Sequence, residues 1–553
     1  MTEPLVEVTD LVVDFPVGGA GEYVRAVDGV SFTLEPGRAL GIVGESGSGK
    51  STVAAALLGL HRGTGAHLDG TVRVGGTDVT AAPPAELRRL RGGTAAMVFQ
   101  DPLSSLDPYY AIGDQIAEVH RIHADVSRRA ARARAVEVLD RVGIPDAARR
   151  ARLRPHEFSG GMRQRALIAM ALACEPRLLI ADEPTTALDV TVQAQILDLL
   201  HGLREERGLG LLLVTHDVGV AAESVDELLV MRDGTAVERG PVAEVLASPR
   251  HAYTTALLAA VPRLDGVAAA TRTGPEGAVV GSAVLEADGL RREFGRRGRA
   301  VTAVGGVSLT VRAGETLGIV GESGSGKSTL GRMLVGLLAP TTGRVRHEGR
   351  DVTGSPAGAQ MVFQDPVSSL NPRRSIGESI ADPLRAAGER DEKTIRARVG
   401  ELLDRVGLDP AHHDRYPHEF SGGQRQRVGI ARALAPDPWL IVCDEPVSAL
   451  DVTTQAQVTS LLAELQRDLG LALVFIAHDL AVVRQVSDRV AVMRDGLIVE
   501  EGTAAEVYDR PQHPYTRQLL AAVPSLDPAR AAERRAARRA VPDLGEQPAP
   551  ARV

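Results

Sequence analysis

The sequence predicts an α/β protein that consists of two tandem copies of one domain. The segment GIVGESGSGKST occurs at residues 41–52 and again at 318–329, and PHEFSGG occurs at 155–161 and 417–423. In both halves, short apolar runs alternate with helical stretches and end at glycine-rich or acidic motifs. Because the motifs keep the same order in both halves, we infer a duplication of one domain.

Each half is predicted to contain a parallel sheet with an inserted group of helices. Near-continuous apolar runs predict buried strands at 40–44, 178–182 and 211–216. Helices are expected at 51–60, 191–207 and 218–224. From Gln100 to Ser159 strands are hard to find, and residues 127–142 have helical character. This stretch therefore predicts a helical subdomain inserted into the core.

The repeat and the local composition set the expected domain bounds. We expect a first domain at 5–263, a linker at 264–284, a second domain at 285–526 and a tail at 527–553. The first half carries a longer segment at roughly 62–93 that the second half lacks. The tail is rich in Ala, Arg and Pro, and we interpret it as solvated surface. The alternative is that the tail binds an acidic membrane surface or a partner.

Composition excludes several classes of protein. With 553 residues, 44% hydrophobic and 24% charged, the chain is typical of globular proteins rather than disordered or collagen-like ones. Its longest apolar stretches, such as 166–174 and 471–477, fall short of the roughly 20 residues of a spanning helix. No secretory signal is visible, and the net charge of −8 gives no reason to expect nucleic-acid binding. Cys174 and Cys443 are too few for an iron–sulfur cluster or a four-thiolate zinc site, so neither is expected.

Both copies contain a glycine-rich loop of the pattern G-x-x-x-x-G-K-[ST] after a predicted strand and before a predicted helix. Backbone N–H groups of such a loop wrap nucleotide phosphates, and the helix N-terminus adds its dipole. The chain has only three lysines, and two of them, Lys50 and Lys327, lie in these loops. The predicted phosphate-binding residues are Gly44, Glu45, Ser46, Gly47, Ser48, Gly49, Lys50, Ser51 and Thr52, and Gly321, Glu322, Ser323, Gly324, Ser325, Gly326, Lys327, Ser328 and Thr329.

Two apolar runs end in an Asp-Glu pair, which predicts the metal and water positions of the site. Asp182 and Glu183 end one run, and Asp444 and Glu445 end its copy. Successive side chains of a strand point in opposite directions, so the two acids can serve different purposes. We expect the aspartates to lie in the Mg²⁺ shell with the hydroxyls of Ser51 and Ser328, and the glutamates to polarise the attacking water as catalytic groups.

The sequences FSGGM (158–162) and FSGGQ (420–424) resemble the LSGGQ signature of ATP-binding cassette (ABC) ATPases, and the motif order matches this family along nearly the whole chain. The resemblance implies two ABC-ATPase cassettes that pack head to tail and need no homodimer. ATP bound at Lys50 would contact Ser421, and ATP at Lys327 would contact Ser159. The implied signature residues are Ser159, Gly160, Gly161, Ser421, Gly422, Gly423 and Gln424.

The resemblance assigns further roles. His216 and His478 match the switch histidines that contact the γ-phosphate, and Gln100 and Gln364 match the glutamines that touch Mg²⁺ and water. Phe15 and Phe294 match the aromatic residue that stacks on adenine, although Tyr23 is a rival and core packing is an alternative for both phenylalanines. Met162 replaces the signature glutamine, so we expect two hydrolytic sites that differ in rate.

Finer similarity indicates the peptide/nickel importer group of the family. It rests on MVFQDP, PHEFSGG and the matched segments 251–262 (HAYTTALLAAVP) and 513–524 (HPYTRQLLAAVP). The resemblance implies ATP and Mg²⁺ as cofactors, and as partners two transmembrane permease subunits and an extracytoplasmic solute-binding protein. It places the chain at the cytoplasmic face of the cell membrane. The alternatives are a soluble tandem ATPase acting on ribosomes or DNA, and the motor of an exporter; the cargo stays open.

Overall fold

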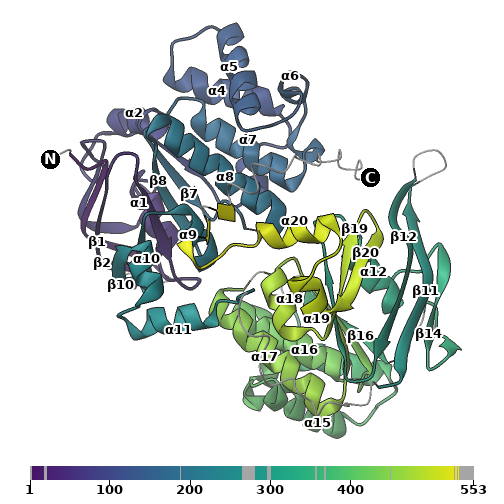
Figure 1. Ribbon diagram of the computed structural model, residues 1–553. Helices are drawn as coiled ribbons and strands as arrows, with labels where there is room; N and C mark the ends of the chain where they lie inside the picture. The colour runs from purple at the N-terminus through teal and green to yellow at the C-terminus, as the bar shows by residue number, and fades with distance from the viewer. Residues whose placement is uncertain are drawn as a thin grey trace. The chain divides into compact units, whose positions relative to one another are not determined.

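A computed structural model describes residues 3–17, 22–186, 188–264, 281–295, 300–354, 358–365, 369–448, 450–528, 530–531 and 533–534. The chain divides into two compact units (Figure 1). The first comprises Met1–Leu188, Val192–Val261 and Pro524–Arg552, and the second comprises mainly Pro262–Val523. Most of the predicted linker (264–284) and most of the predicted tail (527–553) lie outside the described residues.

The first unit contains two sheets. Its strands are β1 (Val6–Pro16), β2 (Tyr23–Leu34), β3 (Ala39–Val43), β4 (His67–Val74), β5 (Thr77–Asp78), β6 (Ala95–Val98), β7 (Leu178–Asp182), β8 (Gly210–Thr215), β9 (Glu227–Arg232) and β10 (Thr235–Pro241). The order β2-β1-β4-β5 forms an antiparallel sheet, and β10-β9-β3-β8-β7-β6 forms a second, larger sheet. In the larger sheet the strands from β9 to β6 are parallel, and only β10 is antiparallel at the edge.

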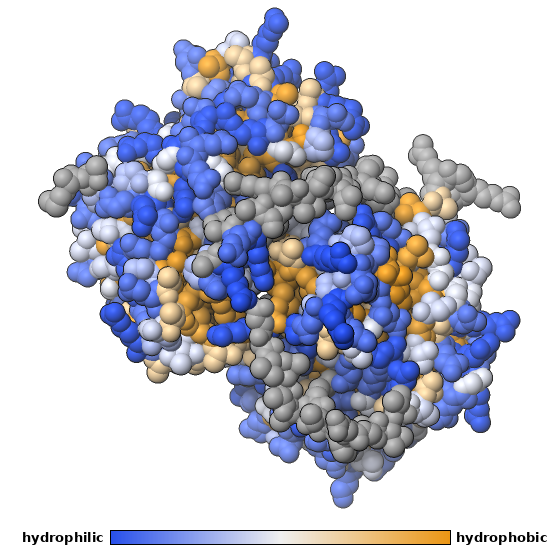
Figure 2. All heavy atoms as spheres, viewed as in Figure 1, coloured by the Kyte–Doolittle hydropathy of each residue, from blue (hydrophilic) through white to orange (hydrophobic). Residues whose placement is uncertain are grey.

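The helices of the first unit follow its strands or form the inserted subdomain. They are α1 (Lys50–Ala56), α2 (Pro84–Gly93), α3 (Pro102–Ser105), α4 (Ile112–His123), α5 (Arg128–Arg141), α6 (Ala147–Arg150), the 3₁₀-helix η1 (Pro155–Glu157), α7 (Gly160–Leu172), α8 (Val190–Arg207), α9 (Val218–Ser224), α10 (Val242–Ala247) and α11 (Ala252–Ala260). Helices α4 to α7 form the inserted subdomain, labelled in Figure 1. Hydrophilic side chains cover most of the viewed surface of this subdomain (Figure 2).

The second unit repeats this plan. Its strands are β11 (Ala283–Phe294), β12 (Val301–Arg312), β13 (Thr316–Val320), β14 (Thr342–His347), β15 (Arg350–Asp351), β16 (Ala359–Val362), β17 (Leu440–Asp444), β18 (Ala472–Ile476), β19 (Arg489–Arg494) and β20 (Leu497–Thr503). Its helices are α12 (Lys327–Leu334), α14 (Ile376–Ala386), α15 (Glu392–Arg405), η2 (Pro410–Asp414), η3 (Pro417–Glu419), α16 (Gly422–Leu434), α17 (Val452–Leu469), α18 (Leu480–Val486), α19 (Ala504–Asp509) and α20 (Pro514–Ala522). The sheet orders are β12-β11-β14-β15 and β16-β17-β18-β13-β19-β20.

The predicted α/β fold class is confirmed, and the burial of the strands explains why the sequence indicated it. Every residue of β3 and β7 is buried, as expected for parallel strands that lie between two layers. The predicted strand 178–182 and helix 218–224 coincide with β7 and α9. The helix expected at 51–60 is shorter, because α1 ends at Ala56 and turns follow it. The extra segment of the first half contains α2, which lies in the connection from β5 to β6.

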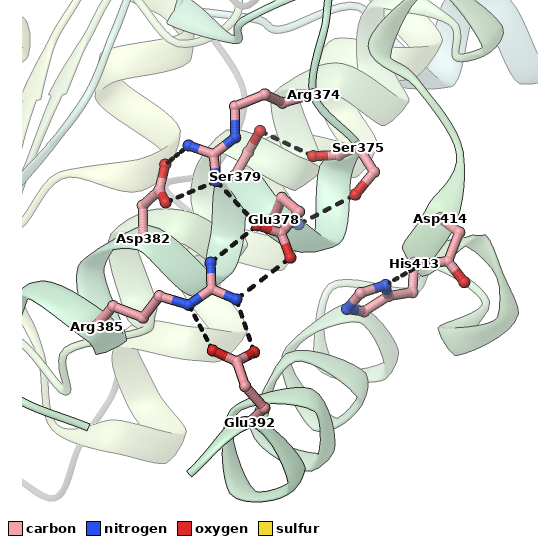
Figure 3. Close-up of polar contacts among 9 residues, drawn as sticks. All are labelled: Arg374, Ser375, Glu378, Ser379, Asp382, Arg385, Glu392, His413 and Asp414. Atoms are coloured by element: carbon pink, nitrogen blue, oxygen red, sulfur yellow. Dashed lines mark hydrogen bonds and ion pairs between the residues drawn. The ribbon is translucent and has the colours of Figure 1, made fainter. Parts of the chain in front are cut away.

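The helical subdomain of the second unit is stabilised by an ion-pair network (Figure 3). Glu378 on α14 accepts hydrogen bonds from Arg374 at 3.0 Å and from Arg385 at 2.9 Å. Arg385 also pairs with Glu392 at the start of α15 at 2.7 Å, so the network joins two helices. The arginines lower the pKa of Glu378 to about 2, Arg385 having the larger effect.

No helix of the described chain is long and apolar enough to cross a membrane.

Candidate active sites

The candidate site of each unit lies where neighbouring parallel strands end. In the first unit, the glycine-rich loop follows β3, Glu183 follows β7, His216 follows β8 and Gln100 lies two residues after β6. Since β3, β8, β7 and β6 are adjacent in the sheet, their carboxyl ends bring these groups to one edge. The second unit repeats the arrangement with β13, β17, β18 and β16.

The glycine-rich loops require glycine for a steric reason. Gly49 has φ 94° and Gly326 has φ 100°, in the left-handed region. A Cβ atom on Gly49 would lie 2.3 Å from the carbonyl oxygen of Ala26, and one on Gly326 would lie 2.2 Å from that of Ala303. The loops therefore press against the neighbouring strands β2 and β12, which hold them at the start of α1 and α12.

The two loop lysines are buried and hydrogen-bonded to their own loops. Lys50 Nζ donates to the carbonyl oxygens of Gly44 at 2.8 Å and Glu45 at 2.6 Å. Lys327 Nζ donates to those of Gly321 and Glu322, both at 2.7 Å. Burial lowers the pKa of Lys327. Each ammonium thus lies inside the curve of its loop, where a phosphate group of a bound nucleotide would meet it.

Hydroxyl and carboxylate oxygens next to the lysines suit Mg²⁺. Ser51 Oγ donates to Asp182 Oδ1 at 3.0 Å, and Ser328 Oγ donates to Asp444 Oδ1 at 2.8 Å. Burial raises the pKa of both aspartates. Mg²⁺ prefers hard oxygen donors, and a carboxylate with a neighbouring hydroxyl supplies them, so these residues fit the ion.

Each candidate catalytic glutamate lies between a glutamine and a histidine. Gln100 Nε2 donates to Glu183 Oε2 at 2.8 Å, and His216 Nδ1 lies 3.1 Å from Glu183 Oε1. In the second unit, Gln364 Nε2 donates to Glu445 Oε2 at 2.8 Å, and His478 Nδ1 lies 3.3 Å from the same oxygen. Three residues that are distant in sequence therefore meet in each unit.

Burial and the histidine act in opposite directions on each glutamate. Burial alone would raise the pKa of Glu183, but the hydrogen bond and charge of His216 outweigh it and hold this pKa below its ordinary value. Burial alone would lower the pKa of His216, and Glu183 raises it above its ordinary value. Glu445 and His478 behave in the same way. Both glutamates are therefore ionised, the form in which a carboxylate accepts a proton.

The signature serines cap helices, and here the two units differ. Ser159 Oγ accepts the N–H of Met162 at the start of α7, and Ser421 Oγ accepts the N–H of Gln424 at the start of α16. Gln424 Oε1 also accepts the N–H of Ser421 at 3.0 Å, which completes a capping box. Met162 has no such oxygen, and its sulfur lies against the guanidinium of Arg150.

The two candidate adenine-binding phenylalanines have different surroundings. Phe15 is partly buried against the core of the first unit, and its ring meets His61 edge-on at 5.2 Å between ring centres. Phe294 is 43% exposed, with the Arg292 guanidinium 4.9 Å from the ring centre. The rival Tyr23 is 58% exposed at the start of β2. Stacking on adenine stays a prediction for both phenylalanines.

Sequence reasoning missed one residue at the first site. Thr186 Oγ1 donates to Glu183 Oε2 at 2.9 Å, three residues after the glutamate. Its counterpart Ser448 donates instead to the backbone carbonyl of Glu445 at 3.2 Å. A hydroxyl residue at the same place in both copies, DEPTT and DEPVS, was the available signal.

Comparison with known proteins identifies the family. The family model "ABC transporter" matches residues 27–186 and 304–448. The model "Oligopeptide/dipeptide transporter, C-terminal region" matches residues 237–286 and 499–549. Both models match twice, in agreement with the duplication.

Similar proteins agree with these models. The chain is 47% identical over 552 residues to the glutathione import ATP-binding protein GsiA of Escherichia coli (strain K12), covering 92% of this chain and 88% of that protein. It is 46% identical over 558 residues to the protein of the same name from Salmonella paratyphi A, covering 93% and 89%. Among solved structures, cbiO1 from Clostridium perfringens, part of the ABC transporter complex cbiONQ, is 29% identical with a TM-score of 0.37, covering 41% of this chain and 91% of that one.

Two matches to each family model, and relatives 46–47% identical over 92–93% of the chain, lead to one conclusion. The chain belongs to the ABC transporter family and is an ATP-hydrolysing, ATP-binding protein with two fused cassettes and two oligopeptide/dipeptide transporter C-terminal regions.

Proposed function

We propose that this chain is the motor subunit of an importer that takes up glutathione or another short peptide. The single observation that carries the proposal is the presence of both oligopeptide/dipeptide transporter C-terminal regions in a chain that is 47% identical to a glutathione import ATP-binding protein. The cargo itself would be selected elsewhere, by an extracytoplasmic solute-binding protein and by two permease subunits.

The proposed chemistry is positioning and charge neutralisation. Lys50 and Lys327 balance the terminal phosphates, and Glu183 and Glu445 accept the proton of the attacking water. His216 and His478 keep each glutamate ionised and oriented, and Gln100 and Gln364 each donate a further hydrogen bond to the carboxylate. Mg²⁺, when bound by Ser51, Asp182 and Gln100 or by Ser328, Asp444 and Gln364, supplies further neutralisation of phosphate charge. The strongest support is the ionised glutamate within each preassembled set.

We further propose that each ATP is shared between the two cassettes. The head-to-tail arrangement of the family would pair Lys50 with Ser421 and Lys327 with Ser159. The N-terminus of a capped helix presents backbone N–H groups and a positive dipole end, which suits a terminal phosphate. The α7 and α16 helix starts have this character.

A permease segment is the proposed occupant of an exposed apolar surface beside Gln100. Phe99, Leu103, Tyr109 and Tyr110 are 44%, 62%, 80% and 61% exposed, at the entry to the helical subdomain. Exposed aromatic side chains next to a residue that contacts the catalytic glutamate suit a surface that transmits movement. The chain would thereby be held at the cytoplasmic face of the membrane.

Reconstitution tests the proposal. The full chain is co-expressed with candidate permease subunits and purified in detergent. The complex is placed in vesicles with ATP on the motor side and the candidate solute-binding protein on the other. We expect a stable complex and ATP-dependent movement of labelled glutathione or a dipeptide toward the motor side. Movement in the opposite direction would establish an exporter. Failure to bind polytopic subunits, together with co-sedimentation with ribosomes, would support the soluble alternative.

A further inference from the structure

The C-terminal region of each cassette contacts the phosphate loop of the same cassette. Tyr253 on α11 accepts a hydrogen bond through its hydroxyl oxygen from the backbone N–H of Glu45 at 3.2 Å. Tyr515 on α20 accepts one from the backbone N–H of Glu322 at 3.0 Å. Each tyrosine thus reaches across about 200 residues of chain to the residue after the first loop glycine.

The tyrosines are held in place by three further contacts, and all are present in both cassettes. The Glu238 carboxylate on β10 accepts the backbone N–H groups of Arg250 at 2.8 Å and His251 at 3.0 Å. His251 Nδ1 then accepts the N–H of Tyr253 at 3.2 Å and caps α11. The guanidinium of Arg232, at the end of β9, lies 5.1 Å from the centre of the Tyr253 ring.

The second cassette repeats each contact with its own residues. Glu500 accepts the N–H groups of Gln512 at 2.7 Å and His513 at 3.0 Å, and His513 Nδ1 accepts the N–H of Tyr515 at 3.2 Å. Arg494 lies 4.9 Å from the centre of the Tyr515 ring. Because the arrangement occurs twice in one chain, it is a property of this kind of cassette and not of one local packing solution.

The bonded residue is one that the loop lysine also holds. Glu45 donates its N–H to Tyr253, and its carbonyl oxygen accepts Lys50 Nζ at 2.6 Å. In the second cassette, Glu322 is bound in the same way by Tyr515 and by Lys327 at 2.7 Å. When a lysine turns to a bound phosphate, its bond to the loop carbonyl weakens, and the tyrosine remains as the anchor of that residue.

We propose that Tyr253 and Tyr515 are positioning residues for the two phosphate loops, through which the oligopeptide/dipeptide transporter C-terminal regions help to set the affinity for ATP. The inference rests on the proposed role of Lys50, Lys327 and their loops in binding ATP. Neither tyrosine touches the reacting atoms in this assignment. Each acts by holding one backbone N–H, so that the loop is already curved before the nucleotide arrives.

The hydroxyl groups, and not the rings alone, carry the proposal. Tyr253 is 7% exposed and Tyr515 is 2% exposed, so both rings also contribute to packing. A phenylalanine keeps the ring, its packing and the contact with arginine, and removes the hydroxyl that accepts the loop N–H. Glu45 and Glu322 would then lose the partner of a backbone N–H group, which loosens the loop.

The test compares the full-length double variant Tyr253→Phe/Tyr515→Phe with the wild type and with Tyr508→Phe. Tyr508 is a matched control, since it is 7% exposed, lies under Arg484 and donates its hydroxyl to the carbonyl of Leu480 away from the phosphate loop. Calorimetry in the absence of Mg²⁺ gives the Kd for ATP without hydrolysis, and steady-state turnover gives KM and kcat. Hydrogen exchange by mass spectrometry gives the exchange rates of the peptides that contain Glu45 and Glu322.

We expect the double variant to raise Kd and KM for ATP about 2- to 10-fold, the range of one lost hydrogen bond, with kcat at saturating ATP changed less than about twofold. Exchange at the two loop peptides is expected to accelerate in the nucleotide-free protein. Tyr508→Phe should leave Kd, KM and loop exchange unchanged. If the double variant lowers Tm as Tyr508→Phe does but leaves Kd and loop exchange unchanged, the tyrosines serve packing alone and the inference is wrong.

A lysine variant separates this outcome from failure of the underlying site assignment. Lys50→Ala/Lys327→Ala should abolish measurable ATP binding if the loops hold the phosphates. If that variant binds ATP normally, the proposed site is wrong. If the lysine variant loses ATP binding while the tyrosine variant keeps the wild-type Kd for ATP, only the inference about the tyrosines is wrong.

Discussion

At the scale of single residues, the two glutamates show how the backbone itself prepares the chemistry. Glu183 and Glu445 both have φ 47°, in the left-handed region that residues with a side chain rarely adopt. Such a conformation costs on the order of 1–3 kcal/mol and persists only where the surroundings hold it. The backbone N–H groups of these residues donate to Val214 and Ile476 on the next strand, at 2.8 Å in both cases. The turn directs each carboxylate to its glutamine and histidine.

Replacing either glutamate by glutamine tests its role as the base. We expect Glu183→Gln and Glu445→Gln each to lower turnover at its own site by about 10²–10⁴, because the amide cannot accept the proton. Each single variant should therefore retain the turnover of the other site, and the remaining rate should differ between the two single variants. The double variant should be inactive. Phosphate release at saturating ATP measures this. Loss of all turnover in one single variant with no loss in the other would show that only one site hydrolyses ATP.

Thr186 offers a second prediction at this scale. In a Glu445→Gln background, where the first site supplies the turnover, Thr186→Val should lower kcat by about 10- to 100-fold, the effect of removing a hydrogen bond to a charged group. The matched control is Ser448→Ala in a Glu183→Gln background. Its hydroxyl donates to a backbone carbonyl and not to the carboxylate, so a change below about twofold is expected. Equal losses in both experiments would contradict the assignment.

At the scale of secondary-structure elements, helix starts distinguish the two cassettes. Helix α16 begins with a complete capping box formed by Ser421 and Gln424, and α7 begins with Ser159 and Met162, which supply half of one. Ion pairing also differs, because Glu378 of α14 binds Arg374 and Arg385, whereas the aligned Asp114 of α4 pairs with Arg132 on α5. The two helical subdomains therefore have the same fold with different stabilising interactions.

The capping box gives a stability prediction. Gln424→Met removes the acceptor of the Ser421 N–H and should destabilise the second cassette by about 0.5–1 kcal/mol, seen as a lower denaturant midpoint. Gln424→Glu, which keeps an acceptor oxygen, should restore most of that loss. If the methionine variant is as stable as the wild type, the box contributes nothing at this helix.

The network in Figure 3 gives a pH dependence. The folded-state pKa of Glu378 is lowered to about 2 from an ordinary 4.5, so the network stabilises the folded state above pH 4.5 and loses this effect as the pH falls toward 2. Since the side chain is 42% exposed, we expect Glu378→Gln to lower Tm by only about 1–3 °C at pH 7. This difference from wild type should shrink as the pH falls below 4.5.

Glu401→Gln serves as the control for charge alone. Glu401 lies on α15 and pairs with Arg398 at 3.2 Å as a 66% exposed side chain. Its replacement should change Tm by less than about 1 °C at every pH. A Tm difference for Glu378→Gln that stays constant from pH 7 to pH 3 would mean that the ion pairs are not its source.

At the scale of the whole molecule, the proposed sharing of each ATP makes each site depend on both halves of one chain. Under the proposed head-to-tail arrangement, Ser421 serves the ATP whose hydrolysis uses Glu183, and Ser159 serves the ATP that uses Glu445. Differences in capping at Ser159 and Ser421 would then affect opposite sites. This is the physical basis for expecting unequal rates.

Non-additivity tests that pairing. Ser421→Asp keeps a good N-cap residue and places a negative charge where a terminal phosphate would lie. We expect it to lower turnover by at least about tenfold at the Lys50 site only. Combined with Glu183→Gln it should then cause little further loss, whereas combined with Glu445→Gln it should remove most of the remaining turnover. The reverse pattern would place Ser421 with Lys327 and reject the head-to-tail assignment.

The sequence alone determined the duplication, the α/β class and most of the site. Buried parallel strands appear in the sequence as apolar runs, and the glycine-rich or acidic motifs at their ends are short local patterns. Both can therefore be recognised without knowing any tertiary contact. For the same reason Asp182 and Glu183 could be named before their contacts were known, whereas His216 and Gln100 were named through the resemblance to the family. The family match depended on the same motifs.

Only the tertiary structure decided which partner each group has. The contact of Tyr253 with Glu45 and the left-handed backbone of Glu183 have no local sequence pattern of their own. They depend on how strand ends, loops and a distant helix come together. A linear sequence records the order of residues, whereas a hydrogen bond depends on distance and direction between groups that folding brings close.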